Sequence, residues 1–254
     1  MKPLLTLPLE DDPGAPDRKR AFNEHLFTVV AGEYDFITKA LSLGRDAAWK
    51  RQLVAGLPAL SQPVCVDLAC GTGDITRLLA RRYPEGSVVG LDLTEPMLAL
   101  ARERTAESNV RYAQADMCAT QLPAGTVDIV TGGYALRNAP RLETALAEIQ
   151  RLLRPGGVAT FLDFSKPPAG RAQRLELSVL KAWGGFWGCL LHASPRVYTY
   201  IAESLRRHPD RRELHAVIER SGFRIVGSAC FFAGIIEIVT FRKPAGQETH
   251  HAPG

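Results

Sequence analysis

Residues 64–76 read VCVDLACGTGDIT, and they carry the clearest indication of the fold in this chain. Its first half is an apolar run that ends in an acid, Asp67, and its second half is a glycine-rich turn that carries a second acid, Asp74. A strand that runs into such a turn and then into a helix is typical of the first unit of an α/β sheet. In these sheets ligands bind at the carboxyl ends of the strands, so the turn is a candidate ligand site.

The rest of the chain continues this alternation of strands and helices. Amphipathic helices are predicted at about 73–82, 95–106 and 141–153, and RPGG at 154–157 ends the last of them. The predicted strands are 63–68, 87–92, 110–114, 127–132, 157–163, 223–231 and 234–242. The turn near Ala233 is too tight for a helical crossover, so the final strand should run antiparallel to its neighbour. We therefore expect an α/β fold with a doubly wound, mostly parallel seven-stranded sheet and an antiparallel last strand.

Two helical segments stand outside this alternation. Apolar residues at helical spacing predict a helical N-terminal cap within 17–57, and 171–207 reads as a helical insertion before the last strand pair. Residues 17–244 should then form a single domain with a Rossmann-like sheet. The two ends lack an apolar period, so we expect a flexible N-terminus at 1–16 and a flexible tail at 245–254.

Composition narrows the class of protein. The chain has 254 residues, 46% of them hydrophobic, which suits one sizeable domain, and a net charge of +4, which is too small to indicate a nucleic-acid binder. DFSKPPAG at 163–170 has neither an acid directly next to the prolines nor an aromatic residue after them, and amino-methylating enzymes of nucleic acids carry both. Five scattered cysteines without a C-x-x-C pair predict a reducing compartment, the cytoplasm, and no metal site. No uncharged stretch is long enough to cross a bilayer as a helix.

The charge of the glycine-rich turn indicates what it holds. A dinucleotide fingerprint needs a third glycine where Thr76 stands, and a phosphate-binding Walker loop needs a Gly-Lys-Ser/Thr sequence that is absent. Asp67 and Asp74 flank the turn, and acids repel a phosphate but attract a cation. S-adenosylmethionine fits, because it has no phosphate and carries an ammonium and a sulfonium group.

The residues expected to bind this cofactor follow successive strand ends. Asp67 is placed to meet its amino-acid end, directly or through water, while Gly71 and Gly73 let the backbone approach closely. Asp92 ends the second strand, where a carboxylate suits the two ribose hydroxyls. After the third strand come two candidates for the adenine, Asp116 for its amino group and Met117 for its ring.

Several further motifs resemble one known family. These are VAGEYDFITKALSLGRDAAWKR at 30–51, GGYALRNAP at 132–140, RLLRPGGVATFLDFSKP at 151–167 and YTYIAESLRRHPDRRELHAVIERSGF at 198–223. Together they are similar to the ubiquinone/menaquinone biosynthesis C-methyltransferase family, a family of class I S-adenosylmethionine-dependent methyltransferases. The resemblance covers the chain from about residue 22 to residue 236.

The resemblance implies carbon methylation of a polyprenylated hydroquinone, either demethylmenaquinol or a ubiquinone precursor. By family pattern Arg137 and Asn138 face the acceptor, and the cofactor contacts include Thr72, Asp92, Leu93, Asp116, Met117 and Gly133. Four positions depart from the pattern: Thr38, Ala135, Gly184 with its neighbour Gly185, and Val239. These departures leave open whether the quinol is a benzoquinol or a naphthoquinol, and whether the acceptor is a quinol at all.

A ring carbon becomes an adequate nucleophile only when an adjacent phenol loses its proton. Arg137 is our candidate for that step, because a guanidinium can stabilise the phenolate or orient the water that takes the proton. It is not itself a base, since arginine keeps its proton in proteins. Asn138 could hold a quinol oxygen, and further candidates for the acceptor site are Tyr34, Asp35 and Tyr200.

Two other functions remain open at this point. One is a small-molecule methyltransferase of the same fold with a different acceptor, and the other is a non-catalytic subunit that binds S-adenosylmethionine as a scaffold. The aromatic-rich segment 183–191 could touch the headgroups of a membrane or could pack on the sheet as core. A homodimer is also left open.

Overall fold

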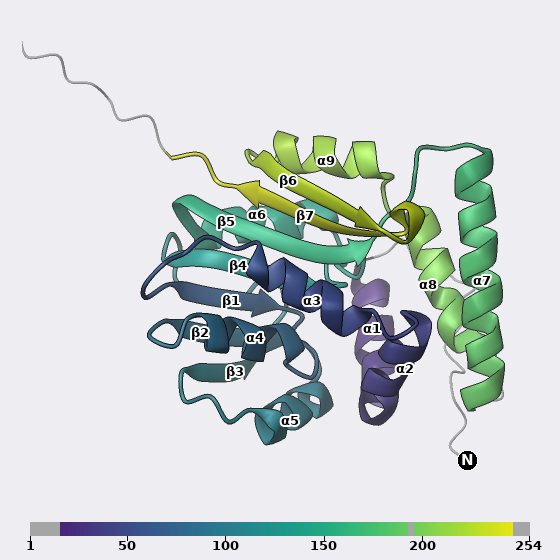
Figure 1. Cartoon of the computed structure of the whole chain (residues 1–254), viewed down its shortest axis with the longest axis horizontal. Helices are drawn as coiled ribbons and strands as arrows, with labels where there is room; N and C mark the ends of the chain where they lie inside the picture. Colours follow the sequence, from purple (N-terminus) through teal and green to yellow (C-terminus); the bar gives the residue numbers. More distant parts are fainter. Residues whose placement is uncertain (1–15, 193–195, 246–254) are drawn as a thin grey trace, which may run out of the picture.

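The computed structural model describes residues 16–192 and 196–245, with the side chains of 16 and 190–200 left out. Its sheet has seven strands in the order β3-β2-β1-β4-β5-β7-β6 (Figure 1). They are β1 (Val64–Leu68), β2 (Ser87–Asp92), β3 (Val110–Gln114), β4 (Val127–Gly133), β5 (Leu153–Phe164), β6 (Arg224–Phe231) and β7 (Ile236–Arg242). Strands β1 to β5 pair in parallel, and β7 is antiparallel to both β5 and β6. The predicted doubly wound sheet is confirmed.

Some helices of the described segments alternate with the strands along the chain, and others lie beyond the edge of the sheet. They are α1 (Pro16–Val30), α2 (Tyr34–Leu41), α3 (Asp46–Ala55), α4 (Asp74–Arg82), α5 (Glu95–Arg104), α6 (Leu142–Leu152), α7 (Arg171–His192), α8 (Arg196–Arg207) and α9 (Arg211–Arg220), with 3-10 turns η1 (Ala31–Glu33) and η2 (Phe232–Gly234). Helices α1, α2, α7 and α8 gather beyond the carboxyl ends of the parallel strands (Figure 1). They are the predicted cap and the predicted insertion.

Each face of the sheet has its own hydrophobic core. On one face α3 and α4 bury Trp49, Leu53 and Leu79 against β1, β2 and β4. On the other face α6 and α9 bury Leu146, Ile149 and other apolar side chains. Because both faces are covered, β1 and β4 are buried nearly throughout, as their continuous apolar runs predict.

The glycine-rich turn joins β1 to α4 in a backbone conformation that favours glycine. Gly71 and Gly73 have φ angles of 54° and 82°, in the left-handed region. A Cβ on Gly73 would lie 2.4 Å from the Tyr112 hydroxyl oxygen, so the close packing of β3 against the turn also requires glycine there. The turn lies at the carboxyl end of β1, and the carboxyl end of β2 is next to it because the two strands pair in parallel.

Several predicted boundaries were wrong. The strand predicted from residue 157 begins at Leu153, because Leu153 already pairs with Val127 and a register shift then carries β5 past the RPGG sequence. The last strand begins at Ile236, since η2 occupies the start of the predicted segment. Most of the proposed flexible ends, 1–15 and 246–254, lies outside the described residues.

Candidate functional site

Two adjoining cavities lie where the cap helices meet the carboxyl ends of the strands. The larger measures about 370 Å³ and the smaller about 90 Å³. The smaller is lined by six of the predicted cofactor residues: Gly71, Asp92, Leu93, Asp116, Met117 and Gly133. These residues come from four different strand ends, and parallel strands bring such ends to a single edge of the sheet.

Asp92 joins the end of β2 to the glycine-rich turn. Its carboxylate accepts hydrogen bonds from the backbone N–H of Gly71, at 2.8 Å, and of Thr94, at 2.9 Å. Burial raises the pKa of Asp92, and these backbone N–H groups oppose the rise. The carboxylate is thus held in one orientation at the wall of the smaller cavity.

Asp116 has a partner that the sequence did not reveal. One carboxylate oxygen accepts from the Cys118 N–H at 2.8 Å, and the other lies 3.3 Å from the Arg20 guanidinium of α1. Arg20 also lines the smaller cavity. Helix α1 therefore covers the predicted adenine end of the site, a contact that no local pattern in the sequence signals.

The other three predicted cofactor residues, Asp67, Thr72 and Gly73, line neither cavity. Asp67 is only 1% exposed, and its two oxygens accept from the hydroxyls of Thr76, at 2.6 Å, and Thr131, at 2.8 Å. Burial raises its pKa to about 6. Thr72 is buried and donates to Asp35 at 3.0 Å, and Gly73 caps α4.

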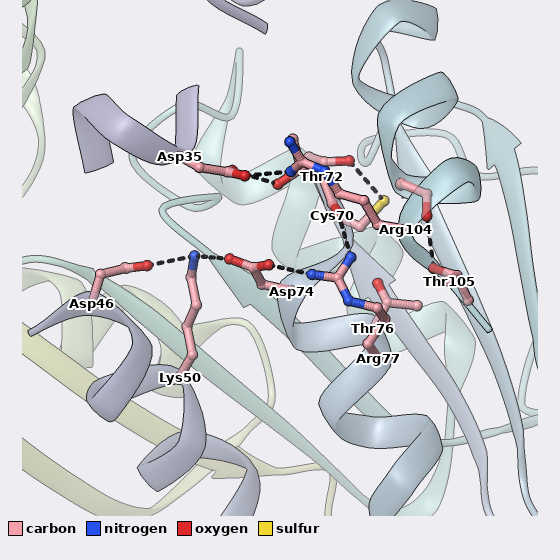
Figure 2. Close-up of polar contacts among 12 residues, drawn as sticks. Asp35, Asp46, Lys50, Cys70, Thr72, Asp74, Thr76, Arg77, Arg104 and Thr105 are labelled. Atoms are coloured by element: carbon pink, nitrogen blue, oxygen red, sulfur yellow. Dashed lines mark hydrogen bonds and ion pairs between the residues drawn. The ribbon is translucent and has the colours of Figure 1, made fainter. Parts of the chain in front are cut away.

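Asp74, the second acid of the turn, also has partners within the chain. Figure 2 shows a line of polar contacts that runs from α3 to the turn. Lys50 lies 2.6 Å from Asp46 and 3.0 Å from Asp74, and Asp74 lies 2.6 Å from Arg77. Arg77 in turn donates to the Thr72 carbonyl at 2.8 Å. The two acids that indicated a cationic ligand are thus engaged by the protein itself, and neither lines either of the two cavities described above.

The lining of the larger cavity is almost wholly apolar, and it includes three of the proposed acceptor residues, Tyr34, Arg137 and Asn138. Apolar side chains of α1, α2, α7 and η2 line it, and Arg137 and Asn138, which are neighbours in the chain, are among its few polar lining residues. Of the four positions that depart from the family pattern, Thr38 lines this cavity. Ala135, Gly184 and Val239 are buried and do not.

Arg137 is buried, at 4% exposure, and firmly held. Its Nε lies 3.5 Å from the Asp163 carboxylate, its Nη1 donates to the Ser204 hydroxyl, and its Cζ lies 5.2 Å from the centre of the Phe164 ring. The Arg137 backbone N–H donates to Asp163 at 3.0 Å as well. Sequence reasoning had missed Asp163 and Ser204, which orient the guanidinium.

The remaining acceptor candidates separate in the structure. Tyr34 lines both cavities. Asp35 lines neither, because its carboxylate binds the Thr72 hydroxyl and the Arg104 guanidinium (Figure 2). Tyr200 belongs to α8, and its side chain lies outside the described residues.

The sheet order and the ligand site at its carboxyl edge define the fold of a class I S-adenosylmethionine-dependent methyltransferase. An S-adenosylmethionine-dependent methyltransferase from Thermotoga maritima shares this fold, with a TM-score of 0.62 at 17% identity over 86% of this chain and 99% of its own. A likeness at that identity supports the fold alone.

Residues 16–243 match the model of the ubiE/COQ5 methyltransferase family, and the chain belongs to that family. It is 36% identical to a demethylmenaquinone methyltransferase of Thermus thermophilus, over 79% of this chain and 92% of the relative. It is 34% identical to a ubiquinone/menaquinone biosynthesis C-methyltransferase of Escherichia fergusonii, over 88% and 91%. The chain is a methyltransferase, and its cofactor is S-adenosylmethionine.

The residues that line the smaller cavity suit the chemistry of that cofactor. Gly71 offers backbone without a side chain, Asp92 offers a buried carboxylate, and Leu93 and Met117 offer apolar surface for a flat ring. The described helices include none that is long and apolar enough to cross a membrane.

Proposed function

We propose that this methyltransferase methylates a ring carbon of a polyprenylated hydroquinone. The observation that carries the proposal is the larger cavity, which is apolar along most of its wall, has Arg137 and Asn138 in its lining, and adjoins the smaller cavity. An apolar cavity with a few convergent polar groups suits a ligand with a long hydrocarbon tail and a polar head. The names of the relatives, which act in menaquinone and ubiquinone biosynthesis, agree with this acceptor.

Arg137 stabilises the phenolate that makes the ring carbon nucleophilic. When bound, S-adenosylmethionine supplies an electrophilic methyl group, so the protein has to orient the acceptor and exclude water. Lys19 donates to the carbonyls of Arg137, at 2.9 Å, and of Ala139, at 2.6 Å, and adds positive charge nearby. Burial and Arg137 lower the pKa of Lys19 to about 8.

His208 is not the base in this scheme. It is buried close to Arg137, and burial together with the positive charges of Arg137 and Lys19 lowers its pKa to about 3. A histidine with so low a pKa is a poor acceptor of a phenol proton at neutral pH. In the proposed scheme the proton passes instead to a water molecule that Arg137 orients.

Asn138 and the predicted cofactor residues have separate roles in the proposal. The Asn138 amide donates to the Tyr134 carbonyl at 2.8 Å, which fixes the side chain between the two cavities, within reach of a quinol oxygen. Asp67, Thr72 and Gly73 do not line the cavity but support the glycine-rich turn, and Asp67 reaches the amino-acid end of the cofactor directly or through water. Gly71, Asp92, Leu93, Asp116, Met117 and Gly133 contact it directly.

A turnover assay tests the proposed acceptor. The purified protein is mixed with S-adenosylmethionine and either a short-chain demethylmenaquinol or the matching benzoquinol, both kept reduced, and the added methyl is located by mass spectrometry. We expect carbon methylation of at least one quinol, and a fall in kcat of about 100-fold or more in Arg137→Ala. If neither quinol is methylated while calorimetry shows that the cofactor binds, the acceptor is a different small molecule.

Peripheral membrane contact belongs to the same proposal. Phe186 is 56% exposed, while Trp183 lines the larger cavity and Gly184 is buried, so the segment 183–191 divides between surface and interior. A cytoplasmic enzyme with a prenylated acceptor has to collect it from a lipid surface. The homodimer stays a prediction without a structural argument.

A further inference from the structure

The wall between the two cavities is aromatic. Among the described residues, four line both cavities: Phe27, Tyr34, Tyr134 and Asn138. Three of the four carry aromatic rings, and none carries a charge. A methyl group that passes from the cofactor to an acceptor in the larger cavity must cross this wall, so the sulfur that bears the methyl lies beside it.

The ring of Tyr34 lies next to the glycine-rich turn. A Cβ built on Gly71 would lie 3.9 Å from Cε1 of Tyr34, which is ordinary van der Waals contact. The Phe27 ring meets the Tyr34 ring edge to face, with centroids 6.2 Å apart and an interplanar angle of 71°. Helices α1 and α2 thus bring two rings to the wall that the two cavities share.

Tyr134 is fixed by a hydrogen bond to helix α3. Its hydroxyl donates to the Asp46 carboxylate at 2.7 Å, and Asp46 is held by Lys50 at 2.6 Å. Its φ angle of 57° is in the left-handed region, a strained conformation for a tyrosine and one that persists where the surroundings demand it. The Tyr134 hydroxyl is thus bound to Asp46, and the residue lines both cavities.

Of the three carboxylates that line the smaller cavity, Glu24 is exposed on α1 and the other two have partners within the protein. Asp92 accepts from two backbone N–H groups, and Asp116 binds Arg20 and the Cys118 N–H. A sulfonium is a cation, and the negative face of an aromatic ring attracts a cation with an energy that grows as water is excluded. We propose that Phe27, Tyr34 and Tyr134 form an aromatic aperture that binds the sulfonium of the cofactor by cation–π attraction.

The test compares two ligands that differ in charge at the sulfur. S-adenosylmethionine carries the sulfonium, and S-adenosylhomocysteine is the neutral thioether. Calorimetry should give dissociation constants for S-adenosylmethionine that are about five- to thirty-fold higher in Tyr134→Leu and in Phe27→Leu than in the wild type. The dissociation constant for S-adenosylhomocysteine should change by less than about twofold in the same variants, because the neutral sulfur gains nothing from the rings.

Two further variants separate charge recognition from packing. Tyr134→Phe keeps the ring and should keep the wild-type ratio of the two affinities. Phe232→Leu removes a ring that lines the larger cavity but not the smaller, and should keep the ratio as well. An equal loss for both ligands, or no loss for either, would overturn the proposal. If Tyr134→Leu does not fold, Phe27→Leu decides, and the quinol assignment plays no part in the outcome.

Discussion

The buried Asp67 carboxylate lowers the stability of the fold at neutral pH, and the same residue is predicted to contact the cofactor. Burial raises its pKa to about 6, above the ordinary 3.8 of an aspartate, while hydrogen bonds from Thr76 and Thr131 partly oppose the rise. The folded protein therefore holds this proton more tightly than the unfolded chain does. The resulting stabilisation is complete below about pH 4 and is lost as the pH rises through about 6.

Asp67→Asn should accordingly make the protein more stable at neutral pH. An amide cannot ionise, so the free energy of unfolding should exceed that of the wild type by about 1–3 kcal/mol at pH 7.5, with a difference that shrinks toward pH 4. Denaturant unfolding at several pH values measures this. If Asp67 reaches the amino-acid end of the cofactor, the same variant should bind S-adenosylmethionine about tenfold more weakly.

Asp128→Asn is the matched control for the cofactor measurement. Asp128 is also buried, but it lies near the start of β4, where it accepts from the Val64 N–H at 2.8 Å and pairs with Arg154 at 2.5 Å. It is thus at the opposite end of the strands from the cavities. Unchanged cofactor affinity in both variants would leave Asp67 with a purely structural role.

At the scale of elements, Lys50 ties helix α3 to the glycine-rich turn. Its ammonium is buried between Asp46 and Asp74, and although burial alone would lower its pKa, these two carboxylates hold the pKa above its ordinary value. Lys50→Met would leave the buried Asp46 without its cation. We expect a loss of about 3–5 kcal/mol in the free energy of unfolding, measured in urea.

A surface ion pair of similar geometry provides the control for Lys50. Arg81 lies 2.6 Å from Glu107, with 64% of the Arg81 side chain exposed. Arg81→Met should cost less than about 1 kcal/mol, because water screens an exposed pair. The double variant Lys50→Met/Asp46→Asn should recover part of the loss. Equal small costs for Lys50→Met and Arg81→Met would mean that the contacts in Figure 2 do not anchor α3.

Local pattern predicted the elements well and their partners poorly. The apolar run and the glycines of 64–76 were enough for β1, the turn and α4, because strand and turn propensities act over a few residues. The pairing of Leu153 with Val127 and the contact of Arg20 with Asp116 join residues far apart in the chain. Such contacts depend on tertiary packing, so the sequence predicted which residues end the strands but not which of them face the cavity.

In the molecule as a whole, the cap has a small hydrophobic cluster of its own and lies beyond the carboxyl ends of the parallel strands. Leu26, Val30 and Ile37 form a cluster of their own, apart from the two large cores. The larger cavity lies between this cluster and the strand ends. Its lining residues Leu43, Val179 and Phe232 are also exposed, so apolar side chains from three separate segments surround its mouth.

This arrangement predicts that the mouth of the larger cavity faces a lipid surface. Exposed apolar side chains can enter the headgroup region, and a net charge of +4 favours anionic lipids. The double variant Leu43→Ser/Val179→Ser should reduce binding to vesicles of phosphatidylglycerol and phosphatidylcholine by about fivefold or more, as measured by flotation. Leu60→Ser changes an exposed leucine in the segment before β1, at the amino ends of the strands, and should bind like the wild type. Equal binding of all three proteins would mean that the acceptor reaches the cavity by another route, and that the exposed rim serves a different contact.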